Sequence, residues 1–195
     1  SNFSFLRGAS HPEEIVEQAA ALGYPAVALT DYHTFGGIVR AHWAAKKMGI
    51  SLIVGCRIPL YRSLPQQKDY HEHQDEALEA VPSLPLPHAL PCSLLLYPES
   101  KAAYSRLSTL LTLGKSRAPK GACFLGIEDL SDCLCGVHAA VLIDNFADKE
   151  ISSLLDKLKK IFSYGRLSLV IQRTYAPDES RKTALLSDLS NLFQI

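Results

Sequence analysis

The sequence has no excess charge of either sign, since 20 lysines and arginines balance 20 aspartates and glutamates over 195 residues. A balanced chain has no overall field that would draw it onto nucleic acid. Any contact with DNA must therefore come from a local patch or from a neighbouring domain. The sequence also lacks an apolar run of about 18 residues, the length that a membrane-spanning helix needs. We therefore expect no membrane partner.

Cysteines are few and show no pairing pattern. The five cysteines form no C-x-x-C pair, which is the spacing of zinc knuckles and redox motifs. Cys56 and Cys92 lie within apolar runs, where a free thiol behaves as a small hydrophobic side chain. We therefore expect reduced thiols and a cytoplasmic location.

The length and composition fit one folded unit. With 47% hydrophobic residues among 195, the chain can bury one sizeable core, so residues 1–195 are predicted to form a single domain. It begins at Ser1 rather than at a methionine, and we expect it to be a piece of a longer protein.

The stretch from Ala26 to His33 is the centre of the predicted fold. A short apolar run ends there in Thr30 and Asp31, and paired glycines follow at 36 and 37, which is typical of a buried strand that leads into a turn. In α/β folds such strand ends line the functional site. Asp31 is therefore either a site residue or a cap for the helix that follows, and the residues alone leave both open.

Helical and strand patterns alternate along most of the chain. Helices are predicted after a Ser10 cap up to Gly23, from 37 to 49, from 98 to about 113, and over 151–162 and 180–193. Strands are predicted over 26–30, 50–56, 93–97, 137–143 and 167–172. Short connections between them favour βα units around a parallel sheet or barrel.

Residues 62–90 interrupt this pattern. They are rich in charge and carry four prolines, Pro65, Pro82, Pro85 and Pro87. We interpret the segment as a long surface insertion that contributes nothing to the core.

Several segments resemble one known family. They are the run SNFSFLRGASHPEE of residues 1–14, the Thr30-Asp31 turn with Gly37 after it, and the run LIVGC of residues 52–56. Together they are similar to the PHP (polymerase and histidinol phosphatase) domain of bacterial C-family DNA polymerases, most of all the error-prone relatives of the DNA polymerase III alpha subunit. The resemblance implies a distorted (β/α)7-type PHP barrel, truncated at both ends of this chain.

The family's metal ligands carry over poorly. Active members hold metal ions with histidines and carboxylates at strand ends, and Asp31 matches the family's aspartate. The neighbouring ligand position holds Tyr32, with His33 one place further, and a family carboxylate position holds Arg57. A guanidinium about 6 Å from a divalent cation is repelled by roughly 5 kcal/mol at an effective dielectric of about 20. The resemblance leaves Asp31, His33 and His88 as vestigial ligand candidates.

A basic, glycine-containing loop follows the predicted helix that begins near residue 98. Lys115, Arg117 and Lys120 lie between Gly114 and Gly121, a composition that can hold a phosphate backbone. We predict them as nucleic-acid contacts, with a plain cationic surface loop as the alternative.

Two functions follow from the resemblance. The first is a non-catalytic structural or interaction domain of an error-prone DNA polymerase, a nucleotidyltransferase of DNA replication and repair or lesion bypass. Its partners would be the remainder of the polymerase chain, DNA through that polymerase, and accessory proteins, with no cofactor of its own. The second is a metal-dependent phosphoesterase or 3′–5′ proofreading exonuclease with a divalent zinc, manganese or magnesium ion. An unrelated small-molecule enzyme on a βα barrel is a third possibility, because a fold does not fix a function.

Overall fold

Helices and strands alternate in the computed structural model, which describes residues 1–4, 7–62, 89–130, 134–146, 150–162, 165–173, 175 and 177–195. The elements in order are α1 (Pro12–Ala21), β1 (Ala26–Tyr32), α2 (Ile38–Met48), β2 (Ser51–Tyr61), β3 (Ala89–Pro98), α4 (Lys101–Ser116), the short 3₁₀ helix η1 (Glu128–Leu130), β4 (Val137–Ile143), α5 (Ile151–Ile161), β5 (Leu167–Leu169) and α6 (Glu179–Phe193). None of the described helices has both the length and the apolar character needed to cross a membrane.

Helix ends follow local chemistry. Helix α1 has Pro12 at its first position, where the missing N–H costs nothing. Its N-cap is His11, not the predicted Ser10, because the backbone N–H of His11 donates to the Glu14 carboxylate at 2.7 Å. Gly49 ends α2 in the left-handed conformation, at φ 73°, which glycine adopts without a Cβ clash.

The sheet has five strands in the order β1-β2-β3-β4-β5. Strands β1 and β2 are parallel, as are β4 and β5. The pairs β2·β3 and β3·β4 are antiparallel. The α/β class is thus confirmed, but the expectation of parallel pairs throughout is wrong.

The antiparallel pairing of β3 and β4 follows from how the chain connects these two strands. A parallel neighbour needs a crossover that returns the chain to the end where the first strand began. After β3 the chain forms helix α4. The residues that follow α4 return to the end of β3, where Val137 of β4 pairs with Pro98, the last residue of β3. Strand β4 therefore starts where β3 stops and runs the opposite way.

The expected insertion lies mostly outside the described residues. Residues 63–88, which include His88, are not described. Strand β3 begins at Ala89, so the last two residues of the predicted range 62–90 belong to the sheet. At the other end of the range, the Arg62 side chain pairs with Glu150 at 3.1 Å.

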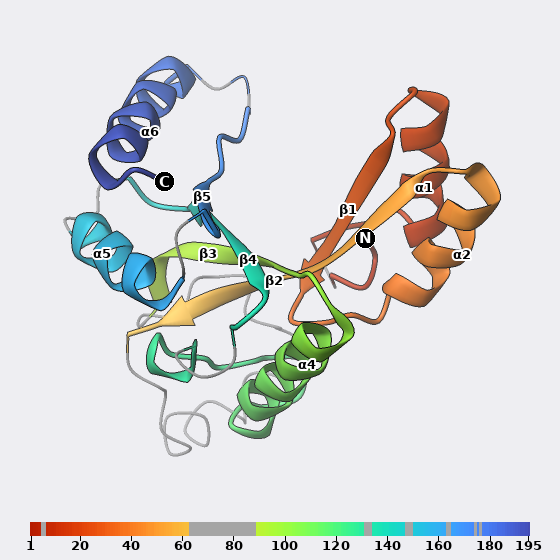
Figure 1. Cartoon of the computed structure of the whole chain (residues 1–195), viewed down its shortest axis with the longest axis horizontal. Helices are drawn as coiled ribbons and strands as arrows, with labels where there is room; N and C mark the ends of the chain where they lie inside the picture. Colours follow the sequence, from red (N-terminus) through yellow and green to blue (C-terminus); the bar gives the residue numbers. More distant parts are fainter. Residues whose placement is uncertain are drawn as a thin grey trace, which may run out of the picture.

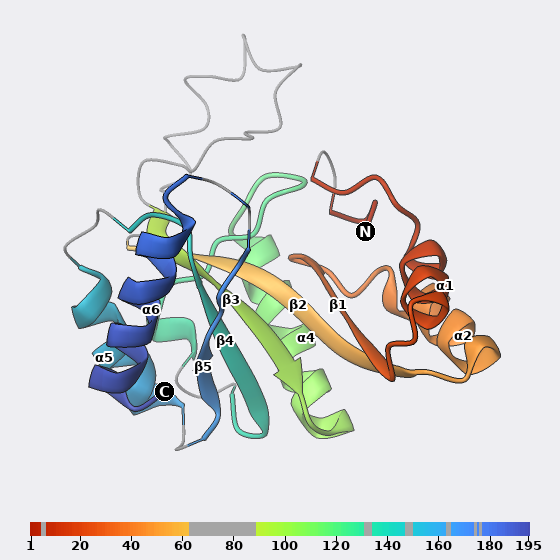
Figure 2. The same cartoon turned by 90° about the horizontal axis from the view of Figure 1, so that it is seen from above.

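The sheet is open in the described part of the chain, with β1 and β5 as its outer strands. Figure 1 shows α1 and α2 beside β1 and, on the opposite side of the molecule, α5 and α6 near β5. Figure 2 shows the same division from above, with the strands crossing between the two groups of helices and α4 behind them.

Side chains alternate between the two faces of the sheet. On β2 and β3, Cys56, Ile58, Leu94 and Leu96 are fully buried in the main core with residues of α4, α5 and α6. A smaller core joins α1, α2 and β1. Each fully buried leucine or isoleucine contributes about 1.5–3 kcal/mol. The alternate residues, among them Arg57 and Leu95, point to the other face, where the candidate site lies.

Candidate functional site

Asp31 is buried at the end of β1 and accepts hydrogen bonds from the N-terminal segment. Its carboxylate receives the amino group of Ser1 at 2.6 Å, the Ser1 hydroxyl at 2.7 Å and the Ser4 hydroxyl at 2.6 Å. Burial opposes ionisation of Asp31, but the hydrogen bonds from the Ser1 amino group and from the Ser4 and Ser1 hydroxyls outweigh it, so the pKa of Asp31 lies below its ordinary value. Asp31 is therefore a charged acceptor whose two oxygens already have donors.

Asp31 does not cap helix α2. The N-cap of α2 is Gly37, and no side chain caps it. The Asp31 carboxylate does pack closely against this glycine, because a Cβ built on Gly37 would come within 3.0 Å of Asp31 Oδ2. The sequence left open whether Asp31 caps a helix or belongs to a site. In the structure it does not cap a helix.

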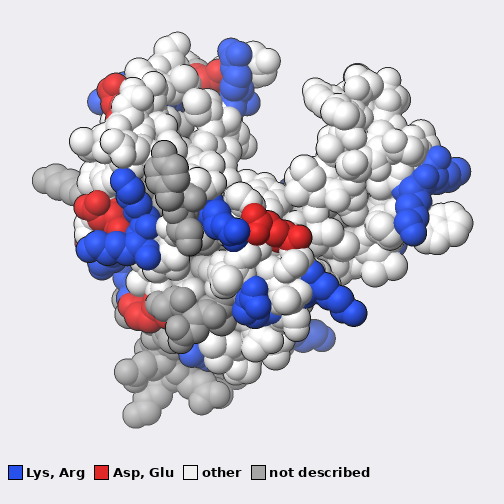
Figure 3. Space-filling model, viewed as in Figure 1, with Lys and Arg blue, Asp and Glu red and all other residues white. Residues whose placement is uncertain are grey.

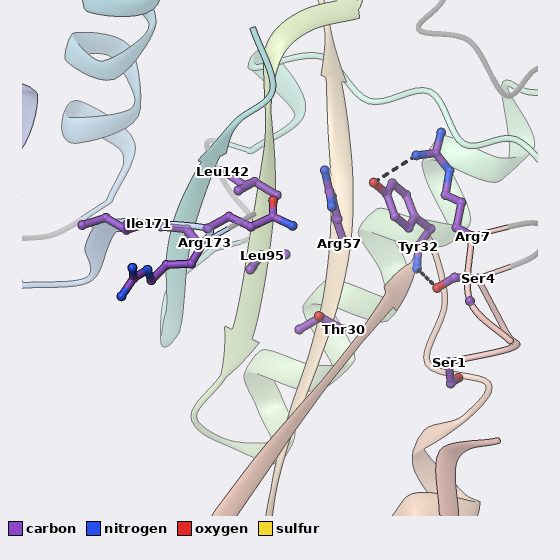
Figure 4. A pocket seen from close by; sticks show the side chains of 13 residues that line it. Ser1, Ser4, Arg7, Thr30, Tyr32, Arg57, Leu95, Leu142, Ile171 and Arg173 are labelled. Carbon is purple, nitrogen blue, oxygen red and sulfur yellow. Dashed lines mark hydrogen bonds between the residues drawn. The ribbon is translucent and has the colours of Figure 1, made fainter. Parts of the chain in front are cut away.

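Tyr32 lies between two guanidinium groups. The Arg7 guanidinium carbon is 4.3 Å from the centre of the Tyr32 ring, and that of Arg57 is 4.6 Å away. Arg7 also donates from Nη1 to the Tyr32 hydroxyl at 3.1 Å. Figure 4 shows the ring with Arg57 on one side and Arg7 on the other. Each cation–π contact of this kind contributes about 0.5–1 kcal/mol where it is exposed and more where it is shielded from water.

Arg57 connects Tyr32 on β1 to Ser93 on β3 and to Asp144, which follows β4. Its Nη2 donates to Ser93 Oγ at 2.9 Å and to Asp144 Oδ1 at 2.8 Å, and the Ser93 hydroxyl donates to the same carboxylate. The Arg57 side chain is 19% exposed, whereas that of Asp144 is 46% exposed. Arg57 Nε is buried and has no hydrogen-bond partner in the described part of the protein. Arg57 is thus held by the two hydrogen bonds of Nη2, while other N–H groups of its guanidinium remain available as donors.

His33 adopts a left-handed backbone conformation, with φ 56°. Its backbone N–H donates to the Arg57 carbonyl at 3.0 Å, while its buried Nε2 has no partner among the residues described. Burial, together with the positive charges of Lys115 and Arg7, lowers the pKa of His33 to about 4. His33 is therefore a neutral imidazole at pH 7.

Arg7, Tyr32 and Arg57 border one open cavity. Its volume is about 460 Å³, and it is lined by the N-terminal segment, by β1 to β4 and by the residues just after β5, namely Ser1, Ser4, Arg7, Gly8, Thr30, Tyr32, Arg57, Leu95, Leu142, Val170, Ile171, Gln172 and Arg173. The space-filling view in Figure 3 shows the molecule hollowed between its two groups of helices. Thr30 and Tyr32 line this cavity, whereas Asp31 faces the other side of β1.

Of the three predicted ligand candidates, the structure describes Asp31 and His33, which have different surroundings. Asp31 lies under the N-terminal segment, the His33 ring stands edge-on to Tyr32 at 5.8 Å between centroids, and His88 lies outside the described residues. Within the ranges that the structure describes, no group of three or more histidines, cysteines, aspartates and glutamates is placed to hold a metal ion.

The predicted basic loop is partly helical. Lys115 lies in the last turn of α4, and Arg117 donates to both carboxylate oxygens of Asp129 at 2.9 Å. Lys120 is exposed. None of the three lines the cavity, and their contact with nucleic acid stays a prediction.

The sequence did not reveal most of the side chains that contact Tyr32 and Arg57. Arg7 stands within the run of residues 1–14 that carries the family resemblance, but nothing in that run shows that it stacks on Tyr32. Strand alternation places Ser93 on the same face of β3 as Leu95, and this was the one available signal for it. Asp144 follows β4 with no distinguishing pattern.

Comparison with known proteins identifies the class to which this fold and site belong. Residues 1–174 match the PHP domain family. The chain belongs to the PHP domain family.

The most informative relatives are polymerases. The chain is 32% identical over 196 residues to the error-prone DNA polymerase of Allorhizobium ampelinum, with 100% of the chain covered. It is 34% identical over 194 residues to that of Caulobacter vibrioides, with 97% covered. In both cases the match spans 15% of the polymerase, so the chain corresponds to a small part of these relatives.

Two solved structures share the fold. A putative metal-dependent phosphoesterase from Bifidobacterium adolescentis matches with a TM-score of 0.59 and 12% identity, covering 100% of this chain and 82% of that one. An amidohydrolase from Chromobacterium violaceum, with bound sulfate and no metal, matches with a TM-score of 0.52 and 14% identity, covering 93% and 78%. At these identities the likeness concerns the fold.

Proposed function

We propose that this chain is a non-catalytic PHP domain of an error-prone DNA polymerase, in which it serves as a structural and interaction module. Its partners are then the remainder of the polymerase chain, DNA through that polymerase, and accessory proteins of replication or lesion bypass. The open sheet is, in this proposal, part of a distorted seven-unit PHP barrel. The relatives that cover 97–100% of the chain support the polymerase assignment.

One observation carries the non-catalytic part of the proposal. A guanidinium stands where the family resemblance places a metal-binding carboxylate, and it is tied down by Ser93 and Asp144 and stacked on Tyr32. A guanidinium donates hydrogen bonds and cannot be deprotonated in a protein, so it repels a cation and offers it no ligand atom.

The remaining donor set does not fit a divalent ion either. Both oxygens of Asp31 already accept hydrogen bonds from the Ser1 and Ser4 hydroxyls, and the Tyr32 hydroxyl oxygen already accepts one from Arg7. Zinc sites need three or four nitrogen, sulfur or carboxylate ligands around one point. The described residues of this site therefore do not fit a divalent metal ion.

Metal analysis of the purified protein tests this proposal. After exposure to zinc, manganese and iron salts and removal of free ions, we expect no stoichiometric metal, because the cationic cluster at Arg57 opposes binding. The matched variant combines Tyr32→His with Arg57→Glu, which restores the side-chain types of the family at both positions. A gain of metal in this double variant would show that these two residues keep metal out.

The contrary result is equally specific. Wild-type protein that retains one or more tightly bound ions per chain, and loses them in Asp31→Ala, would contradict the proposal. It would favour the metal-dependent phosphoesterase or 3′–5′ exonuclease instead.

A further inference from the structure

We propose that an exposed face of helix α2, made of Val39, Trp43, Lys46 and Lys47, binds single-stranded DNA, with a base stacked on the Trp43 indole and the neighbouring phosphates held by the lysines. We call these residues the α2 face. In a chain with balanced charge, a contact with DNA requires a local patch of this kind. The inference goes beyond the proposed function, which assigns DNA binding to the rest of the polymerase.

Helix α2 buries three alanines and exposes its tryptophan. Ala41, Ala44 and Ala45 pack into the smaller core with residues of α1 and β1. Val39 is 76% exposed and Trp43 is 74% exposed, and at i, i+4 spacing the two lie next to each other on the helix surface. Tryptophan side chains are buried to a large extent in most proteins. An indole as exposed as this one is available to a partner.

Positive charge lies beside the indole. Lys46 and Lys47 follow Trp43 at i+3 and i+4 spacing, so they are its neighbours on the next turn of the helix, and both are exposed. Neither lysine forms a salt bridge with a described residue. Helix α2 contains no acidic residue, and its remaining cation, Arg40, pairs with Glu13 of α1. Figure 3 shows lysine and arginine side chains over α2, with no acidic side chain next to them in that view.

An exposed aromatic ring beside cations is the combination that single-stranded nucleic acid needs. The face of any base can stack on an aromatic side chain, and the phosphates on either side of that base pair with cations. In a duplex, neighbouring base pairs cover both faces of each base, so an indole on a convex helix cannot reach them. The α2 face therefore favours a single strand and has no strong sequence preference.

The shape and charge of the surface disfavour a protein as the occupant. The anchoring side chains of a protein partner fill well-packed pockets, and no residue of α2 lines either the cavity at Arg57 or the groove along α1 and β1. A second copy of the chain is disfavoured by repulsion, since two α2 faces in contact would bring the lysines of both copies together.

Tryptophan fluorescence tests the inference, because Trp43 is the only tryptophan in the chain and reports the contact directly. The probe is oligothymidylate of about 20 nucleotides, longer than most single binding sites of this kind, titrated in excess chelator. We expect saturable quenching. The affinity should fall with salt at a log–log slope of about −1.4, from about −0.7 for each of two phosphate contacts. The same strand in a duplex with oligoadenylate should bind at least about tenfold more weakly.

Two variants and a matched control locate the site. Trp43→Ala, followed by the fluorescence anisotropy of labelled oligothymidylate, should weaken binding by about tenfold or more through the loss of stacking. The double variant Lys46→Gln/Lys47→Gln keeps the tryptophan signal and should weaken binding by about tenfold while flattening its salt dependence. The control Lys157→Gln/Lys160→Gln removes the same charge from exposed positions on α5 and should leave the affinity within about twofold.

Three results would overturn the inference. The first is the absence of saturable quenching of wild-type protein by oligothymidylate. The second is equal affinity of wild type and of either α2 variant. The third is a duplex that binds as tightly as the single strand.

Two further results would assign the α2 face to another occupant and overturn the inference as well. Tighter binding of a helical peptide of glutamate and leucine than of oligothymidylate would indicate a protein partner. Dimerisation of wild type that Trp43→Ala abolishes, measured by sedimentation, would indicate a second copy of the chain. No metal takes part in any of these measurements, so each outcome leaves the proposed function intact.

Discussion

At the scale of single residues, His33 combines an uncommon backbone conformation with a buried and neutral imidazole. A φ of 56° is uncommon for residues other than glycine, although asparagine, aspartate and histidine adopt it more often than most. Its neighbours Lys115 and Arg7 add to burial in disfavouring the protonated ring. Arg7, which stacks on Tyr32, thus also helps to keep the His33 imidazole neutral.

Stability should therefore depend on pH through His33. The pKa of about 4 in the folded state lies below the ordinary value of about 6.5, so the unfolded state binds more protons between these pH values. The contribution is fully present above about pH 6.5 and is lost as pH falls toward 4. The integrated loss is about 3 kcal/mol. Urea unfolding of wild type and His33→Asn between pH 7 and 4 measures it.

The variant His33→Asn keeps the left-handed backbone accessible and removes the titrating group. We expect its stability to fall less over this pH range than that of wild type. The control His42→Asn alters an exposed histidine on α2 and should follow wild type. A wild-type pH profile that matches that of His33→Asn would show that His33 is not held neutral by the fold.

At the scale of elements, the sequence predicted where helices and strands lie better than it predicted the direction in which the strands run. The predicted helix 151–162 is α5, over Ile151–Ile161, because apolar side chains at helical spacing are read directly from the chain. The predicted strand 167–172 is only Leu167–Leu169, since an outer strand ends where its neighbour stops pairing. Period-2 patterns contain no information about strand direction, so the antiparallel pairs around β3 were not predictable.

The same limit applies to the candidate site. The resemblance placed Arg57 at a ligand position, and β1·β2 register does put it opposite Tyr32. Its partner Asp144 lies 87 residues further along the chain. Only the folded sheet brings β2, β3 and the end of β4 together, so composition and spacing could not reveal the salt bridge.

The N-terminal segment is an element in its own right, docked on β1 through Ser4. The Ser4 hydroxyl donates to Asp31 at 2.6 Å and accepts from the Tyr32 backbone N–H at 3.0 Å. Replacing it by alanine removes a donor from a buried carboxylate and an acceptor from a backbone N–H. We expect Ser4→Ala to lower the free energy of unfolding by about 1–3 kcal/mol.

Chemical unfolding at pH 7 provides this measurement. The control Ser168→Ala removes an exposed hydroxyl from β5 and should change the free energy of unfolding by less than about 0.5 kcal/mol. Equal stability of Ser4→Ala and Ser168→Ala would mean that the N-terminal segment is not docked as described.

At the scale of the whole molecule, a PHP fold carries an arginine and a tyrosine at two positions where the family resemblance expects metal ligands. The apolar core lies on one face of the sheet with the helices, and the cavity with its arginines lies on the other. This separation lets the lining residues change without loss of the core. Under the proposed function, the domain keeps its fold without the metal ligands of the family.

The most direct test of the central claim is hydrolysis of single-stranded DNA and of a chromogenic phosphodiester in the presence of manganese. The account predicts no turnover by wild-type protein above that of Asp31→Ala, because Arg57 and Tyr32 leave no ligand set for a catalytic ion. Residual activity that is equal in both proteins would belong to a contaminant. Turnover by wild type that Asp31→Ala abolishes would contradict the account and identify the domain as a metal-dependent phosphoesterase.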